Sequence, residues 1–254
     1  MIRSREGFVV VAFFLALILS VLLALPPPAL AQGQAGPQSP GYVKYTLILY
    51  NNTLVSGNHV YATNIVFNPT GIAYDPSNGY IYVANYGSNT VFVINGKTNT
   101  AINTIFVGSF TYAIAYDPSN GYLYVTNTES NNISVIDPKT NTVIENITIG
   151  LGPWDIAYDP SNGYLYVTST ESTIHGTYLV SVINGETNTV ITNITVGLNP
   201  EGIAYDPSNG YLYVANGGSN TVSVINGETN TVITNITVGT HPWGIAYDSN
   251  NGYI

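Results

Sequence analysis

The stretch GIAYDPSNGYLYVAN, residues 202–216, decides the fold of this chain. Its two ends, residues 202–205 and 211–215, are rich in Ile, Tyr and Val, which favour β-strands. The segment between them, residues 206–210, has the composition of a tight turn: the aspartate caps turn amides, proline fixes φ and glycine accepts positive φ. The stretch therefore predicts an antiparallel hairpin.

The hairpin is half of a repeated unit. Two further strands are predicted at residues 221–225 and 231–238, joined by a turn at 226–230. The Ala-Tyr-Asp marker recurs at spacings of 42, 42, 47 and 42 residues, with its aspartates at Asp75, Asp117, Asp159, Asp206 and Asp248. A period near 42 with four short strands is typical of a β-propeller blade, and it fits a parallel β-helix or a β-sandwich less well. We therefore expect an all-β propeller of four-stranded antiparallel blades.

The second strand of each unit carries a further motif, which reads YVAN at 82–85, YVTN at 124–127, YVTS at 166–169 and YVAN at 213–216. Over residues 65–254 the chain resembles the YVTN β-propeller repeat family, with a departure at Ser169. The resemblance implies a propeller, commonly of seven blades, found in surface-layer and other extracytoplasmic proteins of archaea and bacteria. It implies no catalytic residue.

The number of units falls short of seven blades. Residues 71–254 hold about 4.4 units of 42. The repeat region, residues 42–254, is therefore predicted to be a fragment of a longer propeller, truncated at its C-terminal end. Residues 42–67 predict two or three strands, which would complete the last blade and close the ring.

The N-terminal residues 1–31 resemble an export signal. Arg3 and Arg5 precede the apolar residues 8–25, and the small-residue motif at 29–31 suits cleavage. The apolar stretch is long enough to remain as a membrane anchor instead. In either case the repeats are predicted to lie outside the cytoplasm, secreted or at the cell surface, after a Pro/Gly-rich linker at 32–41.

Composition excludes several classes of function. The chain has 5 Lys+Arg against 14 Asp+Glu, a net charge of −9, and no cysteine. Nucleic-acid binding is disfavoured because no basic surface is available for phosphates. Disulfides and thiolate metal sites are excluded.

One position varies more than the strands around it. Just before the first strand of successive units stand Thr70, Tyr112, Trp154, Glu201 and Trp243. We expect this position at the rim of the central channel, on the face that also carries the five extra residues of the 47-residue unit, around 174–178. Tyr112, Trp154, Glu201 and Trp243 are the predicted binding residues, where aromatic rings could stack on a sugar or a partner loop. The alternative is that both tryptophans fill gaps between blades.

Catalytic motifs are absent from the sequence: it has no G-x-S-x-G, phosphate-binding loop or H-E-x-x-H. His175 and His241 share the predicted binding face, where Glu171 or Glu201 would be the nearest third metal ligand, but we predict neither a metal site nor a cofactor. Asp155 and Asp159 lie four residues apart on one strand, roughly 13 Å, too far to act as a pair. The recurrent aspartates are predicted to cap turns.

Two features favour a binding or structural module over an enzyme. Residues 180–197 and 222–239 are identical, so the outer half of these blades carries no unit-specific site. Five sequons predict glycosylation of a surface protein, at Asn51, Asn132, Asn146, Asn193 and Asn235. We expect a surface-layer or adhesion module for protein or carbohydrate partners. The alternative is an extracytoplasmic lactonase-like or redox propeller with its site at the channel.

Overall fold

The computed structural model describes residues 68–171 and 176–254 in full, and of residues 1–67 the backbone of five short strands. The chain divides into two compact units, Met1–Ile65 and Val66–Ile254, and each is described by itself. In the first unit β1 (Ile2–Arg3) pairs with β2 (Val9–Val10), and a three-stranded antiparallel sheet contains β3 (Leu49–Tyr50), β4 (Thr53–Ser56) and β5 (His59–Thr63).

Apart from β1 and β2, the predicted signal, including the rest of the apolar residues 8–25, lies outside the described residues, as does the linker at 32–41. Among the described residues, no helix is long and apolar enough to span a bilayer. The three strands β3 to β5 fall within residues 42–67, where two or three strands were predicted.

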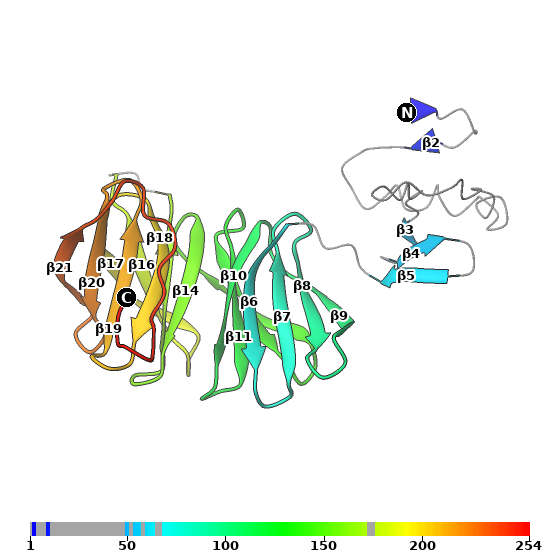
Figure 1. Cartoon of the computed structure of the whole chain (residues 1–254), viewed down its shortest axis with the longest axis horizontal. Coiled ribbons are helices and arrows are strands. Elements are labelled where there is room, and N and C mark those ends of the chain that lie inside the picture. The colour runs from blue at the N-terminus through cyan, green and yellow to red at the C-terminus, as the bar shows by residue number, and fades with distance from the viewer. Residues whose placement is uncertain are drawn as a thin grey trace. The chain divides into compact units, whose positions relative to one another are not determined.

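The second unit contains four sheets, each of four antiparallel strands in chain order (Figure 1). We call them blades 1 to 4. Blade 1 is β6 (Pro69–Asp75), β7 (Tyr80–Asn85), β8 (Thr90–Asn95) and β9 (Thr100–Phe106); blade 2 is β10 (Thr111–Asp117), β11 (Tyr122–Asn127), β12 (Asn132–Asp137) and β13 (Thr142–Thr148); blade 3 is β14 (Pro153–Asp159), β15 (Tyr164–Ser169), β16 (Leu179–Asn184) and β17 (Thr189–Thr195); blade 4 is β18 (Pro200–Asp206), β19 (Tyr211–Asn216), β20 (Thr221–Asn226) and β21 (Thr231–Thr237). The predicted all-β class and four-stranded blades are confirmed.

The first hairpin of each blade has the predicted turn chemistry. In blade 4, Asp206 Oδ1 accepts hydrogen bonds from the Ser208 backbone N–H at 2.8 Å and from its hydroxyl at 2.6 Å, and Gly210 has a φ of +74°. The same capping bonds form at Asp75, Asp117 and Asp159. The prediction that these aspartates cap turns is confirmed.

Apolar side chains from adjacent blades form the core. Tyr124 of blade 2 is fully buried in one cluster with Leu165 and Val167 of blade 3, and Tyr166 of blade 3 packs in the next cluster with Leu212 and Val214 of blade 4. Both faces of a central blade are therefore covered by its neighbours. This arrangement explains why the second strand of each unit is an unbroken apolar run.

The loops at the two ends of the strands lie on opposite faces of the blades. The hairpins at 75–80 and 95–100 lie at one end of blade 1, and the connections after its second and fourth strands lie at the other. In blade 3 these two connections touch, because the Val196 N–H donates to the Tyr178 carbonyl at 3.1 Å. We call this end the connection face; its described loops are 86–89, 107–110, 128–131, 149–152, 170–171, 176–178, 196–199, 217–220 and 238–242.

Candidate functional site

A β-bulge lies near the start of each inner strand, at the connection face. In blade 2, Thr111 pairs with Asn127 and Ile114 with Val125, so two residues of β10 face a single residue of β11. Equivalent register shifts occur in β6, β14 and β18. The two bulge residues are Thr70 and Gly71, Tyr112 and Ala113, Trp154 and Asp155, and Glu201 and Gly202. Since bulges re-aim side chains, the variable position predicted from the sequence is a bulge position.

Threonine hydroxyls hold the bulges in blades 2 and 3. Thr126 Oγ1 accepts the Ala113 N–H at 2.8 Å and donates to the Trp154 carbonyl of blade 3 at 2.8 Å. Thr168 makes the same pair of bonds, to the Asp155 N–H at 3.0 Å and to the carbonyl of residue 201 at 2.7 Å. In these two blades the third residue of the YVTN motif thus holds the bulge of its own blade and attaches it to the next.

Together the bulges line a cavity of about 410 Å³. Its larger side chains come from Tyr112, Trp154, Asp155 and Trp243, and the remaining lining residues are Pro69, Thr70, Gly71, Ala113, Gly202 and Gly244. Three of the four predicted binding residues, Tyr112, Trp154 and Trp243, are therefore brought to one site. The Trp243 side chain is 59% exposed.

Aromatic rings continue from the cavity across the connection face. Tyr112 stacks on Trp154 with ring centroids 3.7 Å apart and an interplanar angle of 28°. Tyr86 meets Tyr112 edge-on at 6.5 Å and lies 4.6 Å from Phe110. We call these four residues, Phe110, Tyr86, Tyr112 and Trp154, the aromatic row. Phe110 and Tyr86 do not stand out in the sequence, because the two residues belong to different connections of the repeat.

Phe110 adopts a backbone conformation that bulky residues seldom take. Its φ is +55°, and the equivalent connection residues with positive φ are Asn68, Gly152, Asn199 and His241. Asparagine, glycine and histidine tolerate this region, whereas a phenylalanine there is an outlier. The Phe110 N–H donates to Asn89 Oδ1 at 3.0 Å, which helps to hold the residue in place. This strained residue places the Phe110 ring at the end of the aromatic row.

Two acidic groups influence the cavity. Burial raises the pKa of the Tyr112 phenol, and the nearby carboxylates of Asp155 and Glu201 raise it further. Hydrogen bonds with the indoles of Trp243 and Trp154 act in the opposite direction and lower this pKa. Burial also raises the pKa of Asp155, although backbone N–H groups donate to its carboxylate. The cavity therefore combines aromatic walls with negative charge.

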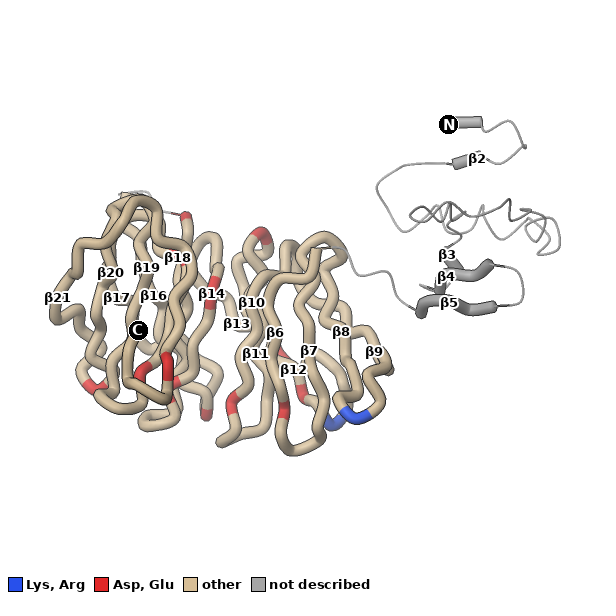
Figure 2. Tube along the Cα trace, viewed as in Figure 1, with Lys and Arg blue, Asp and Glu red and all other residues tan. Residues whose placement is uncertain are grey.

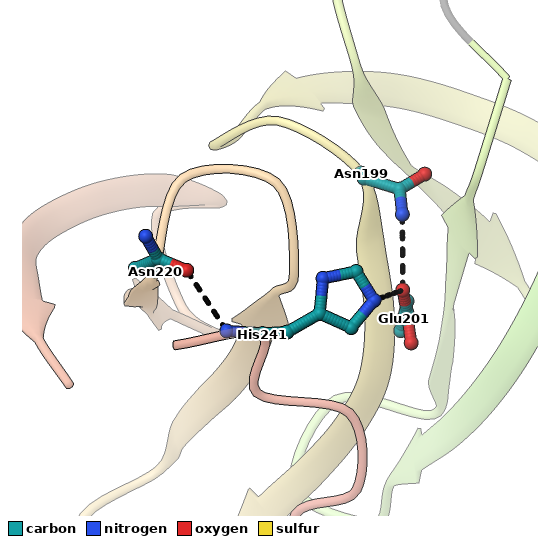
Figure 3. Close-up of polar contacts among 4 residues, drawn as sticks. All are labelled: Asn199, Glu201, Asn220 and His241. Carbon is teal, nitrogen blue, oxygen red and sulfur yellow. Dashed lines mark hydrogen bonds and ion pairs between the residues drawn. The ribbon is translucent and has the colours of Figure 1, made fainter. Parts of the chain in front are cut away.

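Glu201, the fourth predicted binding residue, is not among the residues that line the cavity. It is 7% exposed, and its Oε1 accepts a hydrogen bond from Asn199 Nδ2 at 2.9 Å. His241 Nε2 lies 3.8 Å from the same oxygen, and the His241 backbone N–H donates to Asn220 Oδ1 at 2.8 Å (Figure 3). The sequence could place Glu201 at the bulge but could not give the direction of its side chain.

No metal-binding group of three His, Cys, Asp or Glu residues occurs in the described part of the chain. Of the residues considered as metal ligands, His241 and Glu201 are adjacent, and His175 lies outside the described residues.

The predicted glycosylation sites divide by strand. Asn146, Asn193 and Asn235 are exposed on the outermost strands β13, β17 and β21, and each accepts a hydrogen bond from the serine across from it. Asn132 is half-buried, with its side-chain oxygen bonded to Asn127. Asn51 lies outside the described residues.

Comparison with known proteins supports the architecture. Residues 68–94, which cover most of β6 to β8, match the NHL repeat family. The structure is similar to that of hydrazine synthase from Kuenenia stuttgartiensis, with a TM-score of 0.54 and 18% identity over 79% of this chain and 84% of that one. No curated protein sequence matches the chain. The repeats, the family match and the structural similarity show a β-propeller repeat protein.

Proposed function

We propose that this propeller is of the YVTN type and serves outside the cytoplasm as a binding module, with its ligand site in the cavity at the connection face. The partner would be a protein or carbohydrate of the cell surface, in the manner of a surface-layer or adhesion module. Support for the location comes from the sequence of residues 1–31, which has the order of charge, apolar stretch and small residues typical of export.

The observation that carries the proposal is the aromatic site itself. Tyr112 and Trp154 stack within it, and both tryptophans of the chain line it. Aromatic rings at a concave site with few polar groups favour recognition of sugars or partner loops by stacking. The outer strands offer no comparable site, since residues 180–197 and 222–239 are identical.

Retention on native cell envelopes tests this function. The purified chain is mixed with washed envelopes, and the bound fraction is compared for wild type, Trp154→Ala and Ile233→Ala. Ile233 is exposed on the outer strand β21, far from the cavity in the strand order, and serves as a matched apolar control. We expect retention of wild type and of the control, and loss of retention for Trp154→Ala with its thermal unfolding still cooperative. Equal retention of all three chains would contradict the proposal.

Location is tested separately by protease treatment of intact cells that express the full chain. An exported propeller is cleaved or released without lysis, whereas a chain inside the cytoplasm is protected until the cells are opened.

Intact-mass analysis of the native protein tests the predicted glycosylation. The bare polypeptide mass would contradict the prediction for Asn146, Asn193 and Asn235.

A further inference from the structure

The charge around the cavity is one-sided. Four carboxylates belong to the described connection face and its bulges, those of Glu129, Asp155, Glu171 and Glu201. The two lysines of the blades, Lys97 and Lys139, lie in hairpins at the opposite end (Figure 2). Within the described residues, this face therefore has no Lys or Arg to balance its carboxylates. Such a face attracts cations and repels anions.

Asp155 places one of these charges at the cavity. The equivalent bulge residues are Gly71, Ala113, Gly202 and Gly244, so blade 3 alone has a charged group at this position. The Asp155 carboxylate accepts the Ile156 N–H at 2.9 Å and the Ile203 N–H at 3.0 Å. Both donors are neutral amides. They orient the carboxylate but leave its charge uncompensated, and burial disfavours an uncompensated charge.

The walls of the cavity add a second feature that favours a cation. The rings of Tyr112, Trp154 and Trp243 line the same space as Asp155. Aromatic faces attract a positive group through the ring quadrupole, tryptophan most strongly, and aromatic cages of this kind recognise quaternary ammonium ions. A neutral sugar could stack on the rings, but it would leave the Asp155 charge unbalanced.

We propose that the cavity binds an alkylammonium group, with the rings of Trp154, Trp243 and Tyr112 around the methylated nitrogen and the Asp155 carboxylate as its counter-charge. This inference rests on the proposed function, since it gives the chemical class of ligand for the same site. Glu201 and the other carboxylates of the connection face contribute long-range attraction.

Tryptophan fluorescence provides a direct readout, because the only two tryptophans of the chain, Trp154 and Trp243, both line the cavity. The full chain is titrated with choline chloride at constant ionic strength, and in parallel with 3,3-dimethyl-1-butanol, a neutral molecule of the same shape. We expect a saturable change in emission with choline and little change with the alcohol. A third titration uses vesicles of phosphatidylcholine. A response to free choline but not to the vesicles indicates a soluble ligand, and a response to both indicates a lipid headgroup.

The variant Asp155→Asn keeps an acceptor for a backbone amide and removes the charge. It should weaken choline binding by about tenfold or more, as expected for loss of a charge-assisted contact. Glu228→Gln, exposed in the hairpin between β20 and β21 at the opposite end of the blades, is the matched control and should bind as wild type. Urea unfolding of both variants verifies that they fold. Equal responses to choline and the alcohol, or unchanged binding by folded Asp155→Asn, would overturn the inference.

The two proposals can fail separately. If envelopes retain the chain through Trp154 while choline leaves the emission unchanged, the binding module stands and the ammonium class is wrong. If choline binds and the envelopes retain nothing, the cation site stands and the proposed surface partner is wrong.

Discussion

At the scale of single residues, hydrogen bonds between polar groups join neighbouring blades. The Tyr124 hydroxyl of blade 2 donates to Asn188 Oδ1 of blade 3 at 2.7 Å and lies 3.1 Å from the Gly185 carbonyl. Gly185 must be glycine, because a Cβ there would lie 2.6 Å from Asp117 Oδ2 of the preceding blade. The tyrosine and the glycine of the repeat therefore belong to one interface.

Replacing Tyr124 by phenylalanine should destabilise the protein by about 1 kcal/mol, because a buried hydrogen bond between blades is lost. Tyr213 is the matched control, since within the described part of the chain its hydroxyl is bonded only to Asn209 of its own blade, and the residue is partly exposed. Tyr213→Phe should change the free energy of unfolding by a few tenths of a kcal/mol at most. Urea unfolding of both variants measures the difference, and equal effects would refute this account of the interface.

At the scale of strands, the last residue of the YVTN motif connects three strands of one blade. Asn127 Nδ2 donates to Ser134 Oγ at 2.9 Å, and Ser134 in turn donates to Asn146 Oδ1 at 2.8 Å. Blade 3 interrupts this series with Ser169, whose hydroxyl is buried and has no hydrogen-bond partner among the residues that the structure describes. The departure from the motif is thus a local defect.

Restoring the motif with Ser169→Asn should stabilise the protein by about 1 kcal/mol, because the longer side chain can reach Ser181. The longer side chain has room beside Gly150. A Cβ on this glycine would have one neighbour within 4 Å, the Ser169 hydroxyl at 3.9 Å. In a domain of this size the melting temperature should rise by about 2–4 °C. The control Ser169→Ala removes a hydroxyl that has no hydrogen bond within the described residues, and it should be nearly neutral. A lower melting temperature for Ser169→Asn would show that the longer side chain does not fit and would contradict this prediction.

The sequence predicts strands better than it predicts bulges. The strands expected at 211–215 and 221–225 match β19 and β20 to within one residue, because turn chemistry fixes their ends. The bulges of β10 and β14 leave no mark in the hydrophobic pattern. Thr126 and Thr168 add hydroxyl contacts to these bulges only once two strands have paired, and the bulges of β6 and β18 form with Ala84 and Ala215 in place of the threonine.

The same limit applies to the candidate site. Tyr112, Trp154 and Trp243 could be found by aligning the repeats, because they share one position. Asp155 was considered only as half of a carboxylate pair, although its replacement of glycine or alanine was a visible signal. The direction of the Glu201 side chain depends on Asn199 and on contacts that the sequence cannot supply.

At the scale of the whole molecule, buried tyrosines couple stability to pH. Burial raises the pKa of Tyr82 and of Tyr124 from 10.0 to about 12. The folded state thus favours the protonated phenol, so this contribution to stability is fully present below pH 10 and is lost as the pH rises towards 12. We expect the urea midpoint to fall over this range and to fall less steeply in Tyr124→Phe. A midpoint independent of pH would contradict the predicted coupling.

The central claim is that successive blades bring residues 42 positions apart into one aromatic site around a common axis. Tyr112 and Trp154 give the most direct test, since they come from blades 2 and 3 and stack at 3.7 Å. In a Trp243→Phe background only Trp154 emits, and acrylamide quenching is compared with and without the further change Tyr112→Ala. The account predicts a red-shifted emission and steeper quenching once Tyr112 is removed. Unchanged emission and quenching, in a chain that still unfolds cooperatively, would contradict it.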